Sequence, residues 1–456
     1  MSVETADRLI DEKGNKRTPL SSQRKYTSFD QMKGVKALNL SRADIRSLPK
    51  SLSEMKNLRA LVLHGCTRLK KLPCLANLKE LQLLDLSYTV IEELPPGIEE
   101  LVNLRRLRLS HTSCLKVFRP GVLSNLSSLE ELSMQESRWV WTSEAQGAQV
   151  DEIAGMTHLS ELELKLGDWS DLVHCLSPNL RKSLKRFSLT AGFWGHVRTQ
   201  GAGDNAVVVS GCDLICAGRC PVLPDKTVQL FLQNCQLPES MSFSNMDQLK
   251  NCCIKRCHRM QFLIMVEEDE TRPVLPSLDN LDINWSPDII SLYKGIVPPG
   301  TLANLKILTI VHCHKMMNLF SAELLKQLQC LEKLSVFDCY MMEELVAGGD
   351  LGETFALPRL KTFSLRYLSN LKMVCRGNLS CGSLESIEVD QCPLLKKLPL
   401  ADNELPPMLK VILGSKKWWA GLEWDVPDAH KLLLPLLHSL YEEEFEMEEQ
   451  SYIEEE

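Results

Sequence analysis

Aliphatic residues recur at a fixed spacing from Val35 onward. The pattern is Leu-x-x-Leu-x-Leu, and the third residue after its last leucine is small or contains sulfur. Clear copies have their middle leucines at Leu61, Leu84 and Leu107, which lie 23 residues apart. Because side chains alternate across a strand, the leucines of each copy point to one face and the residues between them to the other. The pattern therefore predicts one short strand in each copy.

This period lies within the range of about 20–29 residues that is typical of leucine-rich repeats. One strand with its return segment cannot bury its own apolar edge, but stacked copies share a continuous core. Looser copies continue along the chain. We call the middle inward-facing residue of each copy its anchor, and we predict that the anchors of all copies stack. These anchors are Leu38, Leu61, Leu84, Leu107, Leu132, Leu162, Phe187, Leu230, Cys252, Leu281, Leu308, Leu334, Phe363, Ile387 and Ile412.

The predicted fold class is an α/β repeat, a curved single-domain leucine-rich-repeat solenoid. Short parallel strands form its concave face, and irregular or short helical returns form its convex face. The solenoid spans 33–426, with long loops near 135–152 and 191–227. The second gap could instead contain a degenerate coil around Val207 to Val209, although a loop is the preferred interpretation.

The segments outside the repeats are predicted from their composition. Residues 1–32 form a short polar segment, and 427–456 form a C-terminal helix and an acidic tail. Nine of the 59 acidic residues lie in 442–456, which leaves 50 acidic against 52 basic residues elsewhere. The body of the chain is thus nearly neutral, and it lacks the one-signed footprint that binding to nucleic acid requires.

No stretch reaches the roughly 18 uninterrupted apolar residues of a membrane span. The first residues lack the basic start and apolar core of a secretory signal. The 17 cysteines are odd in number and many lie within the repeats, rather than in capping clusters at the two ends. We therefore expect a cytoplasmic protein without a membrane span.

The cysteine and histidine clusters resemble metal ligands at first, for example Cys252-Cys253, Cys257-His258 and His312-Cys313-His314. Ligands must converge on one point, however. In this repeat the third residue after the last strand leucine, which we call the slot, points into the core. The cysteines in that slot are Cys66, Cys235, Cys257, Cys313, Cys339 and Cys392. The sequence therefore predicts structural cysteines, no metal site and no cofactor. It also lacks the phosphate-loop, nucleophile-turn and zinc-protease motifs, so no enzymatic activity is expected.

Charged and aromatic residues on the predicted concave face are candidates for binding proteins. Basic Arg105, Arg106 and Arg108 lie beside acidic Glu130 and Glu131. Opposed charges favour charge-matched partners, although a long repeat protein also needs charge for solvation. Exposed aromatic residues often dominate the energy of an interface. The aromatic candidates are Tyr88, Phe231, Trp285, Phe337 and Tyr367.

Three parts of the chain resemble one known family. Residues 89–104 contain Leu94-Pro95 and look like the Leu-Pro repeat of plant nucleotide-binding leucine-rich-repeat disease-resistance proteins of the coiled-coil class. The pair of segments 311–321 and 337–345 is similar to later repeats of the same family. The ending 414–424, with Trp418-Trp419 before Leu422-Glu-Trp, is the more specific match.

The resemblance implies recognition of pathogen effectors or of host proteins that effectors modify. It also implies early repeats that hold a nucleotide-binding switch off, with Arg105, Arg106 and Arg108 as candidate contacts to such a module in another chain. About thirty residues precede the repeats and contain no phosphate loop, so we expect a truncated product or one acting in trans. The alternative is a general intracellular scaffold, such as a substrate receptor of a ubiquitin ligase.

Overall fold

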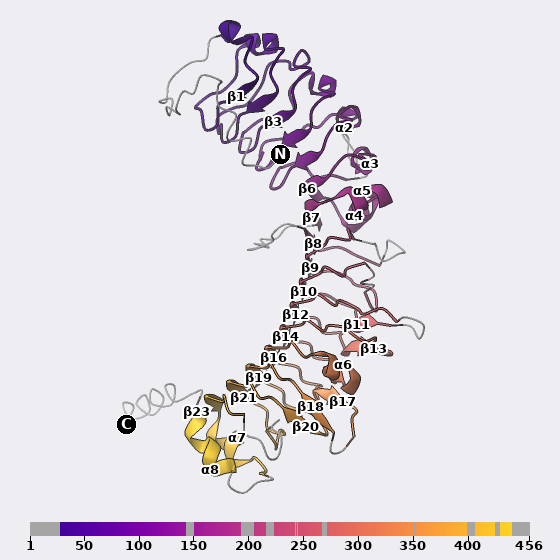
Figure 1. Ribbon diagram of the computed structural model, residues 1–456, viewed down its shortest axis with the longest axis vertical. Helices are drawn as coiled ribbons and strands as arrows, with labels where there is room; N and C mark the ends of the chain where they lie inside the picture. The colour runs from indigo at the N-terminus through magenta and orange to yellow at the C-terminus, as the bar shows by residue number, and fades with distance from the viewer. Residues whose placement is uncertain are drawn as a thin grey trace, which may run out of the picture. The chain divides into compact units, whose positions relative to one another are not determined.

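The computed structural model describes residues 28–142, 150–192, 205–215, 223–241, 243, 245–266, 271–350, 353–398, 406–424 and 429–439. Most of the expected polar segment 1–32, and the whole of the expected acidic tail, lie outside these residues. The chain forms two compact units, one reaching Cys212 and the other containing everything from Thr227. Asp213–Val222 belongs to the second unit and Leu223–Lys226 to the first. Each unit is a stack of coils that combine one strand with a return segment (Figure 1).

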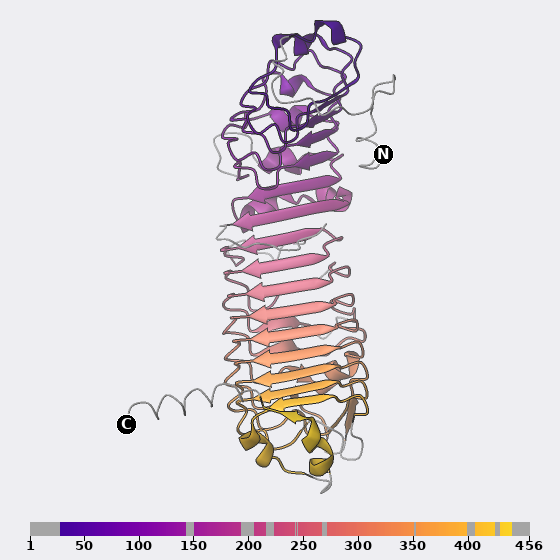
Figure 2. The same ribbon diagram turned by 90° about the vertical axis from the view of Figure 1, so that its left-hand side faces the viewer.

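The first unit contains parallel strands that pair in the order of the sequence (Figure 2). They are β1 (Ala37–Asn39), β2 (Ala60–Val62), β3 (Leu83–Asp85), β4 (Arg106–Arg108), β5 (Glu131–Ser133), β6 (Glu161–Leu166), β7 (Arg186–Gly192) and β8 (Ala206–Ser210). The anchors stack as predicted, since Leu61 pairs with Leu84 and Leu84 with Leu107. All three are fully buried, so the repeat pattern marks the core of this unit.

The preferred loop interpretation of 191–227 is wrong where β8 lies. Val207 pairs with Leu189 of β7, so the coil around Val207 to Val209 is real. All five residues of β8 are buried, whereas β6 alternates between buried and partly exposed positions. The signal was weak because a strand buried on both faces loses the alternation that identified the other strands.

The second unit contains another set of parallel strands. They are β9 (Gln229–Gln233), β10 (Asn251–Lys255), β12 (Asn280–Asn284), β14 (Ile307–Val311), β16 (Lys333–Phe337), β19 (Thr362–Arg366), β21 (Ser386–Asp390), β22 (Val411–Gly414) and β23 (Leu437–His438). Cys252 pairs with Leu230 on one side and with Leu281 on the other, which confirms that it is an anchor. The stack ends in an unpredicted pairing of Leu437 with Ile412.

The return segments are short helices and short strands on the side of the coils away from the strands (Figure 1). The helices of the first unit are η1 (Asp30–Met32), η2 (Lys50–Glu54), η3 (Ile98–Glu100), α2 (Val122–Asn125), α3 (Val150–Ala154), α4 (Trp169–Cys175) and α5 (Pro178–Ser183). Those of the second are α6 (Ala322–Gln327), α7 (Lys416–Ala420), α8 (Ala429–Leu433) and η4 (Leu434–Leu436).

Three parallel pairs of short strands also lie among the returns of the second unit, and the sequence did not predict them. They are β11 (Phe262–Met265) with β13 (Ser291–Lys294), β15 (Phe320–Ser321) with β17 (Val346–Ala347), and β18 (Thr354–Ala356) with β20 (Asn378–Ser380). Within the described ranges, no helix is long and apolar enough to cross a membrane.

Candidate protein-binding surface

A residue with left-handed backbone immediately precedes the inward slot in most coils. The φ angle is 57° at Tyr88, 54° at Trp285 and 53° at Tyr367. A side chain in this conformation costs about 1 kcal/mol or more, but the backbone amide still pairs with the next coil. The amide of Trp285 donates to the carbonyl of Val311 at 2.9 Å, and that of Tyr88 to Ser110 at 2.9 Å.

We call these residues the turn column. Its members in the first unit are Arg42, Gly65, Tyr88, His111, Glu136 and Gly211, and in the second Asn234, Arg256, Trp285, His312, Asp338, Tyr367 and Gln391. The residues on the strands that point away from the core form the exposed strand face. The turn column therefore lies along the edge of this face, at the carboxyl ends of the strands.

Three of the five aromatic candidates belong to the turn column. Tyr88 is 46% exposed, Trp285 50% and Tyr367 49%. The ring of Tyr88 stacks on His111 with centroids 4.2 Å apart, and Trp285 packs on His312 at 3.9 Å. These contacts hold the two rings in place while about half of each side chain stays exposed to solvent, as binding anchors require.

The other two aromatic candidates lie on the exposed strand face and are only partly accessible. Phe231 occupies the middle of β9, and Phe337 is the last residue of β16. The guanidinium of Arg366 on the next strand lies 5.9 Å from the centroid of the Phe337 ring. Phe337 thus already has a cationic neighbour within the chain.

The basic and acidic candidates of the first unit pair with one another. Arg105 bonds Glu130 at 3.0 Å, and Nε of Arg108 bonds Glu131 at 2.6 Å. Arg106, partly exposed on β4, has no ion pair among the described residues. The predicted stripes of opposite charge therefore largely neutralise each other across neighbouring coils, and Arg106 is the arginine of this group that remains available.

The Arg108 pair is the best formed of these contacts. Two guanidinium nitrogens bond the two carboxylate oxygens of Glu131, at 2.6 and 3.2 Å. Partial burial lowers the pKa of Arg108, but its hydrogen bonds to Glu131 and the negative charges of Glu131, Asp85 and Glu161 outweigh this effect, so the pKa is raised. Both side chains are largely covered. Removing either would leave a poorly solvated charge, which favours a structural role for Arg108.

The slot cysteines point inward, as the sequence predicted. Each is buried, and each sulfur reaches a backbone carbonyl, for example Cys313 to Val311 at 3.6 Å. Thr89 occupies the same slot in the first unit and donates to Leu86 at 2.7 Å. The slot therefore satisfies the carbonyls of the turn, and these cysteines do not form a ligand cluster.

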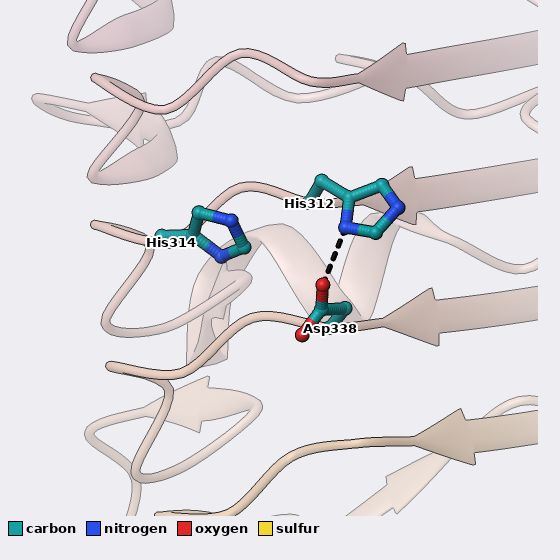
Figure 3. A group of neighbouring side chains, drawn as sticks. All are labelled: His312, His314 and Asp338. Atoms are coloured by element: carbon teal, nitrogen blue, oxygen red, sulfur yellow. Dashed lines mark hydrogen bonds and ion pairs between the residues drawn. The ribbon is translucent and has the colours of Figure 1, made fainter.

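The structure does bring together three side chains that the repeat spacing alone does not place in one group. The ligand atoms of His312, His314 and Asp338 all lie within 4.8 Å of one another (Figure 3). Nδ1 of His312 lies 2.5 Å from Oδ2 of Asp338. A hydrogen bond to this carboxylate raises the pKa of Tyr340. The sequence contains one indication of this group, because His312 and Asp338 both directly follow strands of neighbouring coils.

The stacked parallel strands, matched anchors and inward slot define a leucine-rich-repeat solenoid. Comparison with known proteins agrees: the family described as "Leucine-rich repeat region" matches residues 21–284, more than half of the chain. The family "Plant disease resistance protein RPS2-like, leucine-rich repeats" matches residues 290–401. The chain belongs to the leucine-rich-repeat family, and its repeats are those of plant disease-resistance proteins.

Similar proteins of Arabidopsis thaliana have related descriptions. The probable disease resistance protein At4g27220 is 34% identical over 80% of this chain and 41% of its own length. The disease resistance protein At4g27190 is 29% identical over 90% of this chain and 43% of its own length. The chain thus spans less than half the length of these curated relatives.

Similar solved structures include an internalin of Listeria monocytogenes and the plant peptide hormone receptor RGFR1 in complex with RGF2. Each has a TM-score of 0.40 and 14% sequence identity. The match to the internalin covers 78% of this chain and 87% of the internalin, and the match to RGFR1 covers 90% and 78%. Leucine-rich-repeat domains typically act as interaction modules, because stacked repeats present an extended surface.

Proposed function

We propose that this chain recognises proteins without catalysing a reaction, and that it senses pathogen effectors or effector-modified host proteins in plant innate immunity, in the cytoplasm. The relatives, which are disease-resistance proteins, support the defence role. The observation that carries the proposal is the set of large rings in the turn column. These residues adopt an unfavourable left-handed backbone conformation, and their side chains remain about half exposed.

The contact surface that we propose consists of two parts, one in each unit. In the first unit it contains Tyr88 and Arg106, and in the second Trp285 and Tyr367, with Phe231 and Phe337 partly accessible beside them. Aromatic anchors that lose their last exposed surface to a partner typically contribute about 2 kcal/mol or more each. The neighbouring charged side chains already form ion pairs with one another. They therefore affect electrostatic complementarity with a partner more than they affect affinity.

Glycine substitutions test this surface more cleanly than alanine substitutions. Glycine tolerates positive φ, so Trp285→Gly and Tyr367→Gly remove the ring without adding backbone strain. Capture of partner proteins from infected plant tissue should fall at least about tenfold for the double variant, which corresponds to about 1.4 kcal/mol.

The matched control is Arg256→Gly with Gln391→Gly, which removes two non-aromatic side chains from the same turn column. Its capture should equal that of the parent chain, and circular dichroism should show all chains folded. Equal capture by the aromatic and control variants would count against the proposed surface.

We further propose that Arg106 contacts a nucleotide-binding switch module, either in trans or within a longer receptor. Arg105 and Arg108 are engaged with Glu130 and Glu131, so Arg106→Glu reverses a charge without breaking an ion pair seen in the described residues. Association with a separately supplied switch module should weaken, and more so at low salt. Unchanged association at low salt would reject this contact.

The alternative is a general scaffold, such as a substrate receptor of a ubiquitin ligase. The same capture experiment distinguishes the two functions. Recovery of ligase subunits with the uninfected-tissue sample, and no additional partner after infection, would favour the alternative.

A further inference from the structure

His312 and Asp338 occupy the same position in neighbouring coils. They directly follow β14 and β16, with φ angles of 54° and 53°. His314 lies two residues beyond His312, on the far side of Cys313, which is buried. The turn therefore directs the thiol into the core, while both imidazoles and the carboxylate meet at the end of the strands (Figure 3).

Two aromatic rings hold the imidazoles in place. Trp285 packs on His312 with centroids 3.9 Å apart, and Tyr340 stacks on His314 at 4.3 Å with the planes 5° from parallel. Fixed ring planes reduce the side-chain entropy that ligand binding would otherwise cost. The hydrogen bond between His312 and Asp338 likewise keeps the carboxylate beside the first imidazole.

One nitrogen of this group lacks a partner. Nδ1 of His314 is buried and accepts or donates no hydrogen bond within the described part of the chain. Buried polar atoms are normally satisfied, so this nitrogen is free to bind a ligand. A metal ion is suitable, since a neutral imidazole offers its lone pair to a metal with the hydrogen on the other nitrogen.

We propose that His312, His314 and Asp338 bind a divalent first-row transition metal ion, with Zn²⁺ as the occupant. Two imidazole nitrogens and one carboxylate oxygen suit Zn²⁺, Cu²⁺ or Ni²⁺ rather than Mg²⁺ or Ca²⁺, which prefer oxygen. In a tetrahedral zinc site, neighbouring ligand atoms are about 3.3 Å apart. The present separations, all within 4.8 Å, are close enough for small side-chain rotations to reach that spacing.

Three protein ligands leave one tetrahedral position for water or for a side chain of another protein. His312 keeps 28% and Asp338 18% of the side chain exposed, so the group is accessible from solvent. When His312 binds through Nδ1, its hydrogen resides on Nε2, and the bond between Nδ1 and Asp338 is replaced by two bonds to the ion.

Isothermal titration of the full chain with Zn²⁺, in a buffer that does not chelate, tests the site. We expect one saturable ion per chain. His314→Asn and Asp338→Asn should each lower the affinity at least tenfold, since each removes a ligand and keeps a polar side chain in its place. His64→Asn is the matched control, because His64 packs against Tyr88 and lies 4.0 Å from Asp85 in the first unit.

A second readout uses the ring that packs on His312. Cu²⁺ bound at this position should quench Trp285, and Trp285→Phe should remove that part of the quenching while leaving stoichiometry unchanged. Circular dichroism shows which variants are folded. If one ligand variant does not fold, the other still tests the site. Absence of saturable binding to the parent chain, or binding by folded ligand variants equal to that of His64→Asn, would overturn the site.

Discussion

At the scale of single residues, the turn column shows where backbone preference and function conflict. Glycine suits the left-handed position, as Gly65 does with a φ of 73°, yet Tyr88, Trp285 and Tyr367 occupy it with large rings. Residues that break a local preference are concentrated at functional sites. The sequence could predict that these rings lie near the strand face, but the spacing alone did not reveal the left-handed backbone that exposes them.

The buried cysteines lead to a prediction about thiol reactivity. Burial raises the pKa of Cys313 to about 12 and that of Cys392 to about 12, and the thiolate is the reactive form. At about pH 8, a thiol reagent such as DTNB should modify exposed Cys74 first. The slot cysteines should react only in denaturant. Mass spectrometry of labelled peptides measures this, and rapid native labelling of Cys313 or Cys392 would contradict the inward slot.

The group of His312, His314 and Asp338 shows what a linear pattern misses. In the linear pattern both histidines flank Cys313, and the inward position of this cysteine argues against a ligand cluster. The thiol is indeed buried, but the residues on either side of it face the opposite way. The third member comes from the next coil, 24 residues beyond His314 in the numbering, so only the register of the stack brings it close.

At the scale of elements, the anchors were predictable and the irregular elements were not. Leu308 pairs with Leu334 and Leu334 with Phe363, as the aliphatic spacing requires. In contrast, β8 lacks alternation because it is entirely buried. The short strand β23 lies in a leucine-rich run that favours a helix by composition, and its strand character depends on pairing with Ile412.

The helix α4 gives a prediction for a single element. The carboxylate of Asp168 accepts the amide of Asp171 at 2.9 Å, and the side chain of Asp171 accepts the amide of Asp168. Asp168→Ala removes one half of this capping box and should reduce the free energy of unfolding by about 1 kcal/mol. Urea denaturation followed by circular dichroism measures the change.

Two variants serve as controls for the helix cap. Asp168→Asn retains a capping side chain and should stay within a few tenths of a kcal/mol of the parent chain. Ser170→Ala removes an exposed hydroxyl that donates to Oδ1 of Asp168 at 2.9 Å but leaves both halves of the capping box in place, so it should have a smaller effect than Asp168→Ala. If Asp168→Ala were as stable as both controls, the cap would not contribute to stability.

At the scale of the whole molecule, each unit is a stack in which coils contact their neighbours. The free energy of unfolding of such a stack is close to the sum of the intrinsic stabilities of the coils and the interaction energies between neighbouring coils. Damage to one anchor should therefore spread to adjacent coils and weaken with distance along the unit. The sequence could predict the stacking, but the division into two compact units was not visible in the repeat spacing.

Leu334→Ala tests this local coupling. Leu334 is buried between Leu308 and Phe363, and truncating a buried leucine typically costs about 2–5 kcal/mol. Amide hydrogen exchange should accelerate most in β14, β16 and β19 and much less in β9 of the same unit. Equal acceleration throughout the second unit would show one cooperative block instead of nearest-neighbour coupling.

The surface at the carboxyl ends of the strands is central to the proposed function, and hydrogen–deuterium exchange tests it most directly. The full chain is compared with and without its captured protein partner. We predict new protection in peptides that contain 284–286, 311–312 and 366–368, where Trp285, His312 and Tyr367 lie. Protection confined to return elements such as α6 or β11, with none in those peptides, would contradict the account.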